Sequence, residues 1–196
     1  MLEKVSKNWE VILASKSPRR KELLNNLGIQ FKVALKEVDE TYPSHLSNQE
    51  VAEFISQKKA DAFTLDSNQK LIITGDTIVC KGNKVYGKPK NKEEAFEMIQ
   101  SLSGEVHQVI SSFTIKTKEE QITKSDQVNV FFKALTTEEI EYYISAYSPL
   151  DKAGAYGIQE WIGQIGITKI EGSFYTVMGM PIHLLYEGLK KIMISQ

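Results

Sequence analysis

Apolar positions in this chain come in short runs, separated by segments whose apolar residues recur at helical spacing. The runs at residues 9–15 and 31–35 predict strands, because each is short and bounded by polar residues. A helix is expected between them, from Pro18 to about Leu27. Serine just before a proline favours a helix start, and Gly28 suits its end.

Three further helix starts carry a polar capping residue followed three positions later by glutamate, the pattern of a capping box. These pairs are Ser47 with Glu50, Asn91 with Glu94, and Thr136 with Glu139, and they predict helices over residues 47–63, 91–102 and 136–146. A last helix is expected to begin at Pro181. It carries apolar residues on one face, at Leu184, Leu185, Leu189 and Ile192.

The remaining apolar segments predict more strands. Residues 71–80 form a strongly apolar strand that residues 75–77 interrupt, and residues 106–116 and 121–134 flank a charged turn at 118–120, as in a hairpin. Strands and helices thus alternate, with an antiparallel portion in the middle. We expect an α/β fold with a mixed central sheet flanked by helices, two-lobed with a cleft.

Composition narrows the functional classes. The chain has 196 residues, 41% hydrophobic and 25% charged, as in an ordinary globular protein, and its net charge of −1 argues against general nucleic-acid binding. Cys80 is the only cysteine, so no intrachain disulfide is expected. Neither a signal peptide nor about 18 consecutive apolar residues are found, which predicts a cytoplasmic protein outside the membrane.

The first candidate site is the turn from Ser15 into the helix at Pro18. The only two arginines among 24 basic residues, Arg19 and Arg20, fall in the first turn of this helix. Helix N-termini attract anions, so cations placed there suggest that a phosphate arrives from outside. The alternative is a surface helix start with poor charge placement.

The second candidate is Asp76, inside the apolar strand. An aspartate is rarely buried unless a cation or hydrogen-bond donors compensate its charge. An aspartate in a turn or bulge is the alternative. Glu40 and Lys59 are weaker candidates when each is taken alone.

Two loops add further candidates. Lys88 stands between Gly87 and Pro89, which suits an ammonium held at a phosphate. Residues 151–159 combine small residues, which allow close approach of a ligand, with Asp151, Lys152 and Gln159. The alternative is a glycine-containing loop with an internal Asp–Lys ion pair.

The cations among these candidates would attract a triphosphate, whereas the carboxylates would repel it. At an effective dielectric of about 20, two unit charges 4 Å apart interact by roughly 4 kcal/mol. A divalent cation, Mg²⁺ or Mn²⁺, resolves the conflict and supplies a bound water as nucleophile. We therefore expect a hydrolase that acts on a triphosphate with a divalent metal and a metal-bound water.

These motifs, in this order, closely resemble the Maf family of nucleotide pyrophosphatases, once named septum-formation inhibitors. The resemblance spans nearly the whole chain, and we expect residues 1–196 to form a single domain. The motifs that carry it are Ala14 to Arg20, Gly75 to Val79, Gly87 to Pro89, Asp151 to Gln159, Gly172 to Tyr175 and Gly179 to Pro181.

The resemblance implies a fold related to the inosine-triphosphate pyrophosphatase superfamily and assigns roles to the candidates. Asp76 matches the family's proton acceptor, with Glu40 as a second carboxylate for the metal and Lys88 also catalytic. Arg19, Thr77 and Gln159 match the family's substrate-specificity positions. The polar positions that line the family's cleft are matched by Ser15, Arg20, Glu40, Lys59, Lys88, Asp151 and Lys152.

The same positions look like the branch of the family that acts on dTTP and UTP. Modified pyrimidine triphosphates are an alternative substrate class, and a nucleotide-binding regulator of cell division with little turnover is an alternative function. The oligomeric state is left open, a homodimer included. Relative to common family sequences, Glu160 stands where glycine is frequent.

Overall fold

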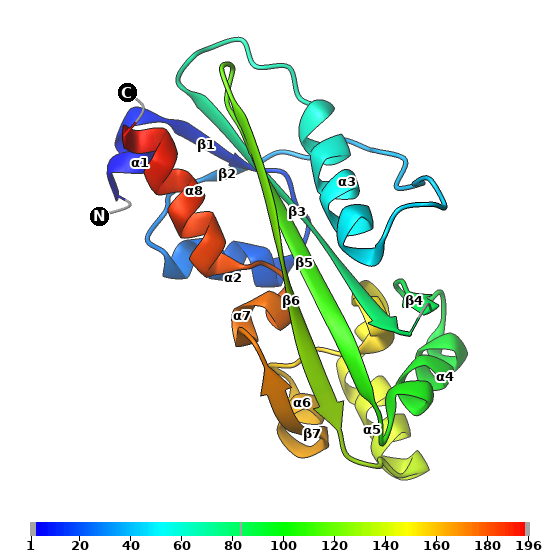
Figure 1. Cartoon of the computed structure of the whole chain (residues 1–196). Helices are drawn as coiled ribbons and strands as arrows, with labels where there is room; N and C mark the ends of the chain where they lie inside the picture. The colour runs from blue at the N-terminus through cyan, green and yellow to red at the C-terminus, as the bar shows by residue number, and fades with distance from the viewer. Residues whose placement is uncertain (1–2, 83, 195–196) are drawn as a thin grey trace. The chain divides into compact units, whose positions relative to one another are not determined.

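A computed structural model describes residues 3–82 and 84–194 of the chain. Its fold is α/β, and the predicted mixed sheet flanked by helices is confirmed (Figure 1). The described residues form seven strands: β1 (Glu10–Leu13), β2 (Lys32–Val33), β3 (Lys70–Lys81), β4 (Lys84–Tyr86), β5 (Val106–Lys116), β6 (Gln121–Phe132) and β7 (Ile167–Glu171).

The sheet is mixed in the way the sequence suggested. Its strand order is β2-β1-β3-β5-β6-β7, with β4 paired to β3. Strand β1 pairs in parallel with β2 and β3, whereas the β3–β4 and β6–β7 pairs are antiparallel. Helices connect the parallel strands, since a parallel pair needs a crossover.

The described helices begin largely where capping residues predicted. They are α1 (Glu3–Asn8), α2 (Pro18–Asn26), α3 (Asn48–Asp61), α4 (Lys92–Leu102), α5 (Thr137–Tyr147), α6 (Trp161–Gly166), α7 (Phe174–Met178) and α8 (Ile182–Ile194), with 3₁₀ turns η1 (Pro149–Asp151) and η2 (Ala153–Ala155). Full capping boxes form at Ser47–Glu50 and Thr136–Glu139. At α4 only Asn91 caps, because the Glu94 carboxylate accepts from the Lys90 N–H instead.

The chain divides into two compact units. The first holds residues 3–76, 111–126 and 179–194, and the second holds residues 77–110 and 127–178, apart from residue 83. Strands β3, β5 and β6 contribute residues to both units. Each candidate residue can therefore be assigned to one unit.

In the first unit, hydroxyl groups of β5 hold helix α3 against the sheet. Ser112 Oγ donates to the Ala52 carbonyl at 2.6 Å, and Thr114 Oγ1 lies 2.6 Å from Ser56 Oγ. All four residues are buried. Because successive side chains of a strand point to opposite faces, residues 112 and 114 define the α3 face of β5.

Helix α8 covers the other face of β5. Phe113 and Ile115 lie next to Gly188, where a Cβ would be 2.9 Å from Ile115 Cδ1. Of the predicted apolar face of this helix, Leu185, Leu189 and Ile192 are buried, whereas Leu184 is only partly covered. The first unit is thus a sheet with one helix on each face of β5.

In the second unit, a buried aromatic cluster joins β5, β6 and the loop after η2. His107 lies edge-on to Phe132 and Tyr156, and its Nε2 is 2.7 Å from the Tyr156 hydroxyl. Burial, together with the positive charge of Lys81, lowers the pKa of His107 to about 4. His107 therefore has a structural role in the core of the second unit.

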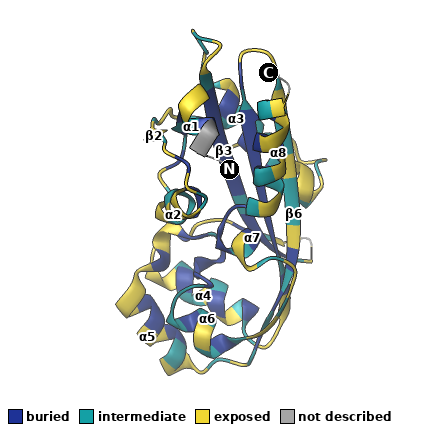
Figure 2. Ribbon diagram, turned by 90° about the vertical axis from the view of Figure 1, so that its left-hand side faces the viewer, coloured by how far each residue is buried: buried dark blue, intermediate teal, exposed yellow. Residues whose placement is uncertain are grey.

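Three expectations from the sequence need correction. Strand β3 runs without interruption from residue 70 to 81 and is buried along nearly its whole length (Figure 2). Strand β2 has two residues where residues 31–35 were expected, and strand β7 with its flanking helices α6 and α7 was not expected.

Among the described residues, no helix is both long and apolar enough to span a membrane.

Candidate functional site

Asp76 lies on β3, within the first unit, and is only 8% exposed. Its Oδ1 accepts a hydrogen bond of 2.7 Å from the Lys59 ammonium of α3. A buried carboxylate without a partner costs several kcal/mol, so this lysine compensates a charge that the strand would otherwise not tolerate. The alternative of an aspartate in a turn or bulge is wrong, because β3 is continuous here.

Glu40 shares the same lysine. Its Oε1 lies 2.9 Å from Lys59 Nζ, so the carboxylates of Glu40 and Asp76 approach one ammonium from two segments of the chain. Glu40 is exposed, with half of its side chain accessible to solvent. The structure thus brings together three residues that were weak or isolated candidates in the sequence.

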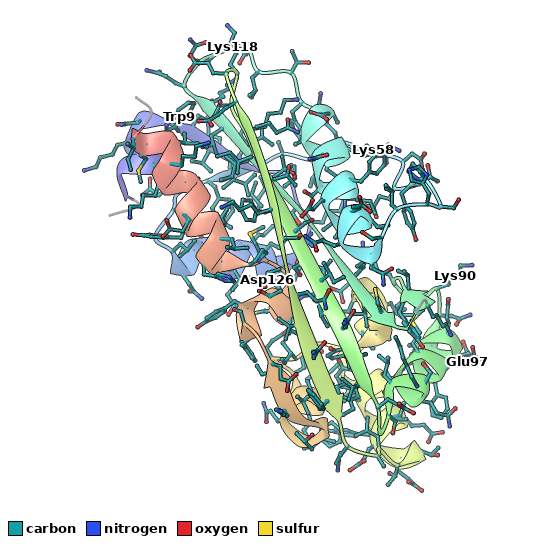
Figure 3. All side chains as sticks on the ribbon, in the orientation of Figure 1. Trp9, Lys58, Lys90, Glu97, Lys118 and Asp126 are labelled. Carbon is teal, nitrogen blue, oxygen red and sulfur yellow. The ribbon has the colours of Figure 1, made fainter. Side chains whose placement is uncertain are left out.

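The segment that carries Glu40 is itself tied to α3. Lys58, labelled in Figure 3, projects from this helix. Its Nζ donates to the Thr41 carbonyl at 3.2 Å and lies 3.6 Å from Asp39 Oδ2. Asp39 in turn accepts from the Thr41 backbone N–H at 3.0 Å. Neighbouring lysines of one helix therefore fix both the loop and the glutamate on it. No sequence motif marked Lys58.

Two carboxylates that face one point fit the way Mg²⁺ binds when substrate phosphates and waters supply its other ligands. In the described part of the chain, no group of three or more His, Cys, Asp or Glu side chains could hold a metal ion. A dedicated protein cage is thus lacking there, and Asp76 and Glu40 are the residues whose placement suits such a cation.

The turn into α2 forms as its sequence predicts. Ser17 caps the helix by accepting from the Arg20 N–H, and Pro18 takes the first helical position. Ser15 Oγ accepts from the Ser17 N–H at 3.2 Å and from Arg20 Nη1 at 3.3 Å. The serine of the motif therefore orients one of the two arginines.

Arg20 is fixed from a second side by the Gly179 carbonyl, which accepts from its Nε at 2.9 Å. Burial lowers the pKa of Arg20, the charges of Asp76 and Glu40 oppose that effect, and Arg19 adds to it. The guanidinium nevertheless keeps its charge, since arginine does not deprotonate in proteins. Both arginines and both carboxylates are therefore electrostatic neighbours in the first unit.

In the second unit, the two candidate loops adjoin. The Gly154 N–H donates to the Gly87 carbonyl at 3.1 Å, which ties residues 151–159 to the loop of the exposed Lys88. Gly154 has φ +68°, and a Cβ there would lie 3.1 Å from both Cγ atoms of Val79. The small residue at this position is required for packing against Val79.

Lys152 is buried and its ammonium lies between two carboxylates. Nζ is 2.8 Å from Asp151 Oδ1 and 3.2 Å from Glu160 Oε1. The other oxygen of Glu160 accepts a hydrogen bond from the hydroxyl of Tyr143, which is fully buried. The internal Asp–Lys pair considered for this loop is present, and Glu160 extends it.

Gln159 carries an unsatisfied acceptor. Its Oε1 is buried and has no hydrogen-bond partner among the described residues, whereas its Nε2 lies on the side of Gly157. A buried amide oxygen without a donor costs about 1–3 kcal/mol. The orphaned oxygen is therefore ready to accept from a bound molecule.

The sequence candidates thus fall into two groups. The first unit brings together Ser15, Arg19, Arg20, Glu40, Lys59 and Asp76. Within the second unit lie Thr77, Lys88, Asp151, Lys152 and Gln159; Thr77 follows Asp76 directly on β3. Sequence reasoning assigned no role to Lys58 and Tyr143 and named Gly179 only within a motif, since their roles depend on contacts between distant segments.

A protein-family comparison matches residues 10–192 to the family described as Maf-like protein. The dTTP/UTP pyrophosphatase of Bacteroides thetaiotaomicron is 50% identical over 186 residues, which cover 94% of this chain and 96% of that protein. The dTTP/UTP pyrophosphatase of Christiangramia forsetii is 45% identical over 196 residues, the full length of both.

A third relative, the dTTP/UTP pyrophosphatase of Parabacteroides distasonis, is 47% identical over 97% of this chain and 99% of its own. Among solved structures, a HAM1 protein from Coxiella burnetii is 14% identical with a TM-score of 0.42, over 63% of this chain and 73% of that one. The family match and the full-length relatives agree with one another. This chain belongs to the Maf family.

Proposed function

We propose that this protein hydrolyses dTTP and UTP to the nucleoside monophosphate and pyrophosphate. One observation carries the proposal: a buried aspartate, Asp76, and a second carboxylate, Glu40, converge on Lys59 beside two arginines. Relatives that match this chain over nearly its whole length are named for that activity. A cluster of this composition suits a substrate that brings both polyphosphate charge and a cation.

In the proposed reaction, a water oxygen bonds to the α-phosphorus and the bond to the bridging oxygen breaks, so pyrophosphate leaves. Asp76 takes the proton of the attacking water. A divalent cation held by Asp76 and Glu40 would neutralise phosphate charge and lower the pKa of a bound water. Arg19, Arg20 and Lys59, all in the first unit, are assigned to the phosphates, for which arginine offers paired donors.

Base recognition falls to Gln159, with Thr77 as the second specificity position. The imide edge of uracil and thymine has an N–H donor between two carbonyl acceptors. Gln159 Oε1, buried and unpaired among the described residues, suits that N–H, and the amide nitrogen suits a neighbouring carbonyl. Both pyrimidines share this edge, which supports a preference for dTTP and UTP together.

The test is a pyrophosphate-release assay across dTTP, UTP, CTP, ATP, GTP and methylated pyrimidine triphosphates. Each is assayed with Mg²⁺, with Mn²⁺ and with a chelator. We expect metal-dependent release that is fastest for dTTP and UTP. Tight nucleotide binding without metal-stimulated release would overturn the proposal in favour of a regulatory nucleotide sensor.

A further inference from the structure

We propose that Glu160 fixes which way the Gln159 amide faces, and that it thereby makes the site discriminate uracil and thymine from cytosine. The inference rests on the proposed function, because it gives Gln159 a pyrimidine to read. It goes further in assigning the discrimination to a carboxylate that does not itself touch the base.

The side chains of Gln159 and Glu160 both lie close to Gly157. A Cβ built on this glycine would lie 2.8 Å from Glu160 Cδ, 2.9 Å from its Oε2 and 3.1 Å from Gln159 Nε2. The amide nitrogen and the carboxylate therefore both lie beside the Gly157 backbone. The amide oxygen, Gln159 Oε1, is the atom left buried without a partner among the described residues.

Electrostatics selects this orientation. An amide NH₂ group is positively polarised, so it is favoured on the carboxylate side. Turning the amide over would place its oxygen toward the oxygens of Glu160, which repel it. Because the cluster is largely screened from water, this preference is stronger than it would be in solvent.

The Glu160 carboxylate is itself held in place. Its Oε1 lies 3.2 Å from Lys152 Nζ, and its other oxygen accepts from the Tyr143 hydroxyl, which in turn accepts from the Gly157 N–H at 3.0 Å. Only 18% of the Glu160 side chain is exposed. A carboxylate with both oxygens engaged cannot turn away from the amide, so the amide has one favoured orientation.

That orientation distinguishes the bases. Uracil and thymine present an N3–H donor next to a carbonyl, which match an amide whose oxygen and nitrogen face them in that order. Cytosine presents an unprotonated N3 acceptor next to an amino donor, so it needs the reversed amide. A fixed amide therefore leaves cytosine with two mismatched pairs, and a freely turning amide accepts either base.

The experiment measures Kd for UMP and for CMP by calorimetry, together with kcat/KM for UTP and CTP. The variants are wild type, Glu160→Gln, Tyr143→Phe and Gln159→Ala. We expect the wild-type preference for uracil to fall about tenfold in Glu160→Gln and by a smaller factor in Tyr143→Phe. Glu171→Gln, which removes the charge of an exposed pair with Lys169, is the matched control and is expected to keep the preference.

A double-variant cycle separates positioning from a general structural effect. If Glu160 acts through the amide, Glu160→Gln has no further effect on the uracil-to-cytosine ratio once Gln159 is alanine. An unchanged ratio in Glu160→Gln, or equal wild-type affinity for UMP and CMP, would overturn the inference. Absence of pyrophosphate release from wild type would instead overturn the proposed function, since the binding ratios are measured without turnover.

Discussion

The Lys59 ammonium lies 2.7 Å from Oδ1 of Asp76, a carboxylate that is only 8% exposed on β3. The same ammonium lies 2.9 Å from Glu40 Oε1, so one lysine pairs with both carboxylates. A divalent cation that bound at this point would compete with the lysine. The Lys59 ammonium would then be free to contact the substrate phosphates, as the proposed reaction requires.

Asp76→Asn is expected to lower kcat for pyrophosphate release by a factor of about 10²–10⁴, because the asparagine side chain accepts no proton. The fold is expected to remain, since asparagine keeps the size and an oxygen acceptor for Lys59. Release kinetics and thermal unfolding of the purified variant test this. Asp61→Asn, which alters an ion pair with Lys116, serves as control, and near wild-type turnover in Asp76→Asn would refute the assignment.

Lys59→Met is expected to lower the free energy of unfolding by roughly 2 kcal/mol, because it leaves Asp76 buried beside Glu40 without their shared cation. Mg²⁺ is expected to restore part of this loss by occupying the point between the carboxylates. Unfolding is measured with Mg²⁺ and with a chelator. If Mg²⁺ raises the Tm of the variant no more than that of wild type, the two carboxylates do not hold the metal.

Acid pH is expected to destabilise the protein through His107. Its folded pKa of about 4 lies below the unfolded value of 6.5, so the neutral form is favoured by folding. The stabilisation is complete above pH 6.5 and is lost as pH falls toward 4, by up to about 3 kcal/mol.

Urea unfolding of wild type and His107→Gln, measured between pH 7 and 4.5, checks this linkage. The amide of glutamine preserves a partner for Tyr156 but does not titrate. Wild type should lose more stability across this range than the variant does. Parallel pH profiles would show that His107 is not the group responsible.

Gly154→Ala is expected to cost about 2 kcal/mol or more, since the residue has φ +68° and its Cβ would press on Val79. Gly28→Ala is the matched control, because Gly28 has φ +74° but nothing within 4 Å of the added Cβ. The difference between the two in chemical unfolding isolates the packing contribution. The extra cost should shrink when Val79→Ala is combined with Gly154→Ala; equal costs for both glycines would contradict this account.

Local features of the fold were open to prediction from the sequence. Ser17, Ser47 and Thr136 start helices because their side chains bond to backbone N–H groups three residues onward, a contact that sequence spacing alone defines. Strands β5 and β6 followed from β-rich runs flanking a charged turn. Strand β7 was missed, since its short segment, three of its five residues exposed, has no strong apolar pattern.

The sequence by itself determined that Asp76 lies inside an apolar segment, which predicts a compensated charge and leaves a turn or bulge as the alternative. Only the tertiary structure decided that the partner is Lys59, 17 residues away on α3, and that Glu40 joins it. Likewise the sequence placed Glu160 beside Gln159, while folding brought Tyr143 to its carboxylate. Such contacts join segments whose meeting depends on how helices pack on the sheet, and residue spacing along the chain does not encode that packing.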